Sequence, residues 1–126
     1  AINIKDAFIV NFSLEFEITV YKNYNNDNVL LKAISELKSY FQIDKWQINQ
    51  PIIISDVKNT IGAVKGVQTV EDVRFKNEYG VGSNYSQYKY SIDGATRNGV
   101  IYPSMDPSVF ELKYPDTDIK GQVTTY

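Results

Sequence analysis

Asp116 to Gly121 read DTDIKG, and this stretch begins like a calcium-binding loop, with acids at the first and third places and glycine at the sixth. The fifth place holds Lys120, a cation where a calcium loop supplies an oxygen ligand. The bidentate glutamate due at the twelfth place would lie beyond Tyr126. We therefore predict no metal site, and we assign these aspartates to turns that they close by bonding their own backbone.

Carboxylate pairs are the other candidates for chemistry. Glu15 with Glu17, and Glu71 with Asp72, are of the residue type that cleaves glycosidic bonds, but spacing alone does not separate acid–base partners from a solvated strand face. The chain has no histidine and no cysteine, which excludes Ser-His triads, thiolate nucleophiles and nearly every zinc arrangement. We therefore predict that the protein is not an enzyme and has no catalytic residue and no cofactor. A hydrolase with a carboxylate pair remains a distant third hypothesis, after the two functions given at the end of this subsection.

The other short motifs in the sequence are weak evidence for any function. Residues 80–83 read GVGS, without the third glycine or the Lys-Ser/Thr ending of a phosphate-binding loop. Asn11 and Asn84 begin glycosylation sequons that we attribute to chance, since the first falls within a predicted strand.

The charge and hydropathy patterns argue against two classes of partner. The formal net charge is −2, the lysines are scattered, and no basic run lies beside a base-stacking aromatic motif, so we expect no nucleic acid. The longest apolar run is too short to span a bilayer, so we expect no membrane association. Nor do we expect a small-molecule substrate.

The elements that position these residues begin with a long strand. Apolar and polar residues alternate from Ala7 to Tyr21, which predicts a strand with one buried face. Fifteen residues exceed the usual strand length. We expect this strand to pair with different neighbours along its length, or to run past its own domain as part of an assembly.

Two helices and a second strand follow. Asn26 or Asp27 is expected to cap the first helix, Ser55 to cap the second, and Gly66 to stop the second. The apolar stripe of the first helix is Val29, Leu30, Ala33, Ile34, Leu37, Tyr40 and Phe41. That of the second is Val57, Ile61 and Val64. Residues 67–77, VQTVEDVRFKN, read as a strand.

The chain therefore predicts one α+β domain over residues 1–126. Residues 1–77 form a β-α-α-β core with two helices packed on one face of a mainly antiparallel sheet. Residues 78–126 form a tyrosine-rich extension of short strands and proline turns. The expected strands of this extension are SQYKYSID, VIYP, SVFELKY and KGQVTTY, with GATRNG as a loop.

Tyr88, Tyr90, Tyr102 and Tyr114 are the candidate functional residues, and we expect all of them in strands. Tyrosine combines a large apolar area with a hydroxyl group and is enriched where proteins meet partners. The alternatives are packing in the sheet core with cross-strand pairing, and stacking on sugars.

Three stretches of the sequence together carry a family resemblance: YFQIDKWQINQPIIISDV, VKGVQTVEDV and IDGATRNGVIYPSMDPSVFELKYPDTDIKGQV. They resemble the C-terminal region of the baseplate wedge protein of T4-like contractile-tailed phages, within the wider baseplate J-like family. The similarity spans Phe8 to Val123, and its most specific part is NGVIYPSMDPSVFELKYPDTDIKG.

The resemblance implies a structural subunit of the virion that is made in the host cytoplasm. Such proteins join neighbouring wedges into the baseplate ring, so the implied partners are further copies of the chain and other baseplate wedge proteins. The family has no catalytic residues to carry over. Its members are several times longer than this chain, which starts at Ala1, so we expect a fragment of a longer protein that forms a dimer or larger species. The alternative is a β-rich carbohydrate-binding module of a receptor-binding virion part.

Overall fold

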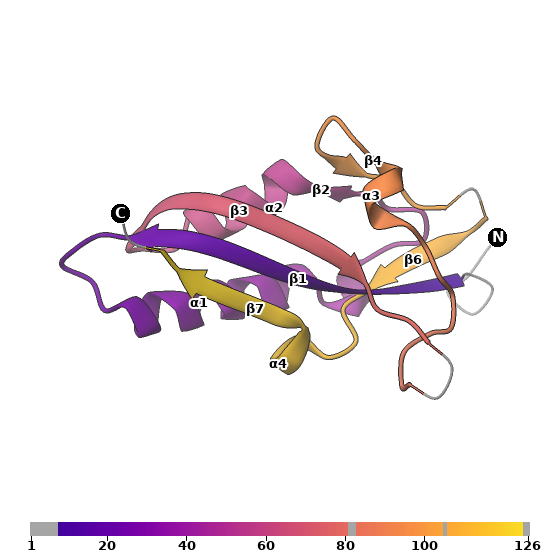
Figure 1. Cartoon of the computed structure of the whole chain (residues 1–126), viewed down its shortest axis with the longest axis horizontal. Helices are drawn as coiled ribbons and strands as arrows, with labels where there is room; N and C mark the ends of the chain where they lie inside the picture. The colour runs from indigo at the N-terminus through magenta and orange to yellow at the C-terminus, as the bar shows by residue number, and fades with distance from the viewer. Residues whose placement is uncertain (1–7, 81–82, 105, 125–126) are drawn as a thin grey trace.

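The computed structural model describes residues 8–80, 83–104 and 106–124, and it confirms the α+β class (Figure 1). Its strands are β1 (Phe8–Val20), β2 (Ile52–Ile53), β3 (Val67–Asn77), β4 (Thr96–Arg97), β5 (Val100–Ile101), β6 (Ser108–Glu111) and β7 (Ile119–Val123). Its helices are α1 (Asn26–Tyr40), the 3-10 turn η2 (Ile43–Lys45), α2 (Ile54–Gly62), α3 (Ile92–Ala95) and α4 (Pro115–Asp118).

β1 is the central strand of the larger sheet (Figure 1). It pairs antiparallel with β3 on one edge, as predicted. On the other edge it pairs in parallel first with β6, over residues 8–11, and then with β7, over residues 14–18. The prediction that this strand changes neighbours along its length is thus confirmed, and pairing within the domain accounts for its length. The parallel pairing was not predicted.

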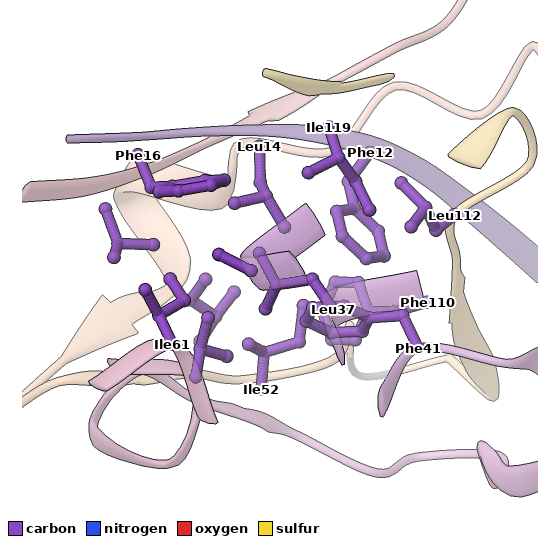
Figure 2. Close-up of a cluster of buried hydrophobic side chains, with 14 of the residues drawn as sticks. Phe12, Leu14, Phe16, Leu37, Phe41, Ile52, Ile61, Phe110, Leu112 and Ile119 are labelled. Carbon is purple, nitrogen blue, oxygen red and sulfur yellow. The ribbon is translucent and has the colours of Figure 1, made fainter. Parts of the chain in front are cut away.

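The core lies between this sheet and the two long helices. Phe12, Leu14 and Phe16 of β1 point toward Leu37 of α1 and Ile61 of α2 (Figure 2). Helix α1 packs near β7, α2 packs near β3, and the two helices contact each other. Both helices therefore cover the apolar face of β1, as its period-2 pattern predicted.

The start of α1 differs from the prediction by one residue. Asn25, rather than Asn26 or Asp27, is the N-cap, and its side-chain Oδ1 accepts a hydrogen bond from the backbone N of Asn28 at 3.0 Å. All three side chains are of types that favour the cap position, so composition alone does not choose among them.

The predicted cap of α2 is wrong. Ser55 lies inside α2, which follows β2 directly, so Ile53 is the N-cap residue and provides no side-chain acceptor. Instead, the backbone N of Ile54 donates to the carbonyl oxygen of Gly99 at 2.9 Å. A tertiary contact from the turn between β4 and β5 replaces the local side-chain cap.

The predicted stop of α2 is also misplaced. The helix ends at Gly62, and Gly66 closes the turn that leads into β3. Gly66 has φ 103°, and a Cβ there would lie 2.7 Å from Val29 Cγ2 and 3.0 Å from the Tyr24 ring. Glycine is needed here because its conformation and the approach of α1 both exclude a side chain.

The predicted strand at residues 86–93 does not form. The backbone N atoms of Tyr88 and Tyr90 donate to the side chains of Ser86 (3.2 Å) and Asn77 (2.8 Å), so this segment is irregular up to α3. Side-chain acceptors take the hydrogen bonds that a strand ladder would use.

The predicted GATRNG loop contains a hairpin instead. β4 and β5 pair antiparallel through a turn at Asn98 and Gly99, which have φ 53° and 77°. Positive φ at both central residues is the property of the tight hairpin turns that favour Asn-Gly. β2 adds to β5 and completes a small second sheet.

Candidate functional site

The structure separates the four candidate tyrosines and places none of them in a strand. Tyr88, Tyr90 and Tyr102 lie together, whereas Tyr114 packs edge-on against Tyr85, with ring centroids 5.4 Å apart. The structure thus brings three of the four predicted tyrosines together and places the fourth elsewhere.

The first group forms a row of rings that begins at β1. The Phe8 ring stacks on Tyr88 at 4.7 Å between centroids, and Tyr88 stacks on Tyr90 at 6.4 Å, both with 22° between planes. The Tyr90 hydroxyl donates to the carbonyl oxygen of Tyr102 at 2.7 Å. Phe8 lies at one end of the row, Tyr102 joins the other end through its backbone carbonyl, and both side chains are 47% exposed. We call Phe8, Tyr88, Tyr90 and Tyr102 the aromatic surface.

Asn11 anchors the tyrosine segment to the sheet. Its side chain is 1% exposed; its Nδ2 donates to Glu111 Oε1 at 2.7 Å, and its Oδ1 accepts from the backbone N of Ser86 at 2.6 Å. The Asn77 side chain donates to the Asn11 carbonyl oxygen and accepts from Tyr90 N, each at 2.8 Å. This role is not visible in the sequence, because an asparagine on the polar parity of a strand is expected to be solvated.

A shallow hollow of about 790 Å³ adjoins the aromatic surface. Tyr90, Tyr102, Arg97, Asn98 and Ser104 contribute to its lining. No acidic residue is among the described lining residues, and Arg97 is exposed. The hollow therefore combines aromatic faces with a cation and small polar groups.

The prediction that the aspartates of the DTDIKG stretch close turns by bonding their own backbone is wrong. Asp116 pairs with Lys38 at 2.6 Å, and both carboxylate oxygens of Asp118 accept from the Tyr85 hydroxyl, at 3.0 and 2.8 Å. The Tyr114 carbonyl oxygen closes the turn instead, by accepting from Asp118 N at 2.8 Å. Tertiary partners thus engage the carboxylates.

Burial, together with the hydrogen bond to the Asp118 carboxylate, raises the pKa of Tyr85 to about 12. The ordinary value is 10.0, so folding favours the protonated phenol. The stabilisation is complete below pH ~10 and is lost as the pH rises from ~10 to ~12. We expect urea unfolding to show Tyr85→Phe less stable than wild type at pH 8, by about 1 kcal/mol for the lost hydrogen bond. The gap should shrink toward pH 12, and a gap independent of pH would contradict this assignment.

The carboxylate pairs lie on the polar face of the sheet. Arg74 Nη2 is 3.4 Å from Glu15 Oε2 and 3.6 Å from Glu17 Oε1, and Arg74 Nη1 is 2.5 Å from Asp72 Oδ2. The hydrogen bond to Asp72 is the largest cause of the raised pKa of Arg74. Glu15 and Glu17 thus share one guanidinium, an arrangement typical of a surface ion-pair network.

Metal-binding clusters and membrane-spanning helices are both absent from the described part of the chain. Residues 8–80, 83–104 and 106–124 contain no group of three or more acidic, histidine or cysteine side chains placed to hold a metal ion. Over the same ranges, no helix has the length and apolar character needed to cross a bilayer. No family model matches the chain, and no curated protein matches it.

Proposed function

We propose that this chain is a structural domain of a phage tail baseplate wedge, and that the aromatic surface is where a second copy docks in the baseplate ring. The observation that carries the docking site is the stack of the Phe8, Tyr88 and Tyr90 rings, with the half-exposed side chains of Phe8 and Tyr102 beside it. Aromatic side chains held rigid before binding lose little conformational entropy on docking and bury a large apolar area. The location that follows is the virion.

The segment that carries the wedge resemblance also supports the proposal. Residues 98–121 supply β5, β6, α4 and the start of β7, so both parallel neighbours of β1 come wholly or partly from it. It also provides Tyr102 of the aromatic surface. A segment that forms strands of the sheet and also contributes to a contact surface is consistent with a structural subunit.

The test is the solution mass by light scattering across a wide concentration range, for wild type, Tyr102→Glu and Tyr21→Glu. Tyr21 is the matched control, because it is 48% exposed but lies just after the other end of β1. We expect a concentration-dependent dimer or larger species that Tyr102→Glu weakens at least ~10-fold, as for an aromatic hot spot. Tyr21→Glu should behave as wild type. A strict wild-type monomer that also fails to bind purified wedge proteins would contradict the proposal.

A second candidate is carbohydrate binding, which the hollow of about 790 Å³ favours, since Tyr90 and Tyr102 line it beside Arg97 and Asn98. Glycan-array binding that Tyr102→Ala abolishes would support this candidate over the first.

A further inference from the structure

A groove follows the seam between α1 and α2 on the helical side of the molecule. Two hollows, of about 300 and 420 Å³, share Glu36 and Thr60 in their linings and so adjoin each other. We call them together the seam groove; its defining residues are Lys32, Lys65, Glu36, Thr60, Tyr40 and Trp46.

The lining of the seam groove is basic, although the whole chain has a net charge of −2. Lys32 and Lys65 line one hollow and Lys45 lines the other, against the single acid Glu36. Among the ion pairs of the described residues, none involves these three lysines. Asp56 lies near Tyr40, where burial first and this carboxylate second raise the tyrosine pKa. The end with Lys32 and Lys65 therefore attracts carboxylates most strongly.

Trp46 and Tyr40 form the aromatic part of the seam groove. Trp46 is only 6% exposed and packs against the rings of Phe41 and Tyr40, at 5.2 and 5.6 Å between centroids. Its Nε1 is buried and has no hydrogen-bond acceptor in the described part of the chain. Because solvent does not reach this atom, a bound segment contacts the ring of Trp46 rather than its N–H group.

We propose that the seam groove binds an acidic amphipathic segment of another protein. The carboxylates of this segment meet Lys32 and Lys65, and its apolar side chains pack against Tyr40 and Trp46. A segment laid along a groove between helices is a common mode of peptide recognition.

A second copy of this chain does not suit the same groove. In a twofold dimer each patch meets itself, so Lys32 and Lys65 would face the same lysines of the partner. Like charges placed together repel each other and oppose such a dimer. The seam groove also shares no lining residue with the hollow at the aromatic surface, so this proposal stands apart from self-association.

The test uses the intrinsic fluorescence of Trp46, the only tryptophan of the chain. The probe is a synthetic helical peptide of ~14 residues, about four turns, with leucine on one face and glutamate on the other. We expect a saturable change in Trp46 emission at low salt. A peptide with lysine in place of glutamate should give no change. Absence of any change with the glutamate peptide, or equal changes with both peptides, would overturn the proposal.

Two pairs of charge reversals locate the binding. We expect the double variant Lys32→Glu and Lys65→Glu to weaken peptide binding at least ~10-fold, since it removes two attractions and adds two repulsions. The control is Lys76→Glu with Lys120→Glu, two exposed lysines that line a hollow on the polar face of the sheet. Equal weakening by both pairs, in variants with wild-type circular dichroism, would refute the site.

Tyr102→Glu should leave peptide binding unchanged. If this variant loses dimerisation but still binds the peptide, the two proposals are tested independently: the aromatic surface by dimerisation and the seam groove by peptide binding.

Discussion

We expect Phe12→Ala to lower the free energy of unfolding by about 3–5 kcal/mol, the range for removal of a buried phenylalanine ring. Phe12 is 1% exposed and contacts the rings of Phe41, Phe110 and Phe75, at 5.0, 6.4 and 6.0 Å between centroids. These rings come from the end of α1, from β6 and from β3. The substitution thus leaves a cavity where three elements meet on β1 (Figure 2). Urea unfolding followed by circular dichroism measures the loss.

Phe8→Ala is the matched control for this prediction. Phe8 is the same residue type on the same strand, but it is 47% exposed, so its loss should cost below about 1 kcal/mol. It should nevertheless weaken self-association, because its ring is one end of the aromatic surface. Equal destabilisation by the two substitutions would mean that the core does not centre on Phe12.

We expect Asn11→Leu to lower the free energy of unfolding by about 2–4 kcal/mol. Leucine has a similar volume but removes the hydrogen bonds of the side chain to Glu111 and to the backbone N of Ser86, and it leaves these partly buried partners unsatisfied. The segment that carries Tyr88 and Tyr90 should then detach from β1. Urea unfolding gives the loss of stability, and light scattering should show weaker self-association as well.

Asn84→Leu is the control, because Asn84 is exposed and accepts from Lys113 only through its backbone carbonyl oxygen. Its expected cost is within about 0.5 kcal/mol, as for surface substitutions elsewhere. If Asn11→Leu were as mild as this control, the buried polar network would not be what holds the tyrosines.

Local periodicity by itself determined the central strand and the two long helices. The alternation from Ala7 to Tyr21 matches β1, and the stripe from Val29 to Phe41 matches α1, because each pattern follows from the rotation per residue of one backbone conformation. The absence of cysteine and histidine likewise limits the chemistry open to this chain, whatever its fold.

Tertiary structure decided which strands pair and which side chains meet. The two strands that lie parallel to β1 read in sequence as separate short strands, since apolar period says nothing about the partner across a sheet edge. The segment with Tyr88 and Tyr90 alternates like a strand, yet Ser86 and Asn77 take its backbone hydrogen bonds. A hydrogen-bond acceptor that folding brings close thus overrides the local preference for a strand, because strand propensity depends strongly on context.

The same reason applies to the candidate functional residues. Composition groups Tyr114 with three other tyrosines, but in the structure Tyr114 lies just before the turn at Pro115 and its ring packs against Tyr85. Asn11 and Trp46 carried no signal in the sequence, because the role of the first depends on hydrogen bonds to distant segments. The place of Trp46 depends on the hollow that folding forms beside it. Neither feature exists until folding has removed these side chains from water.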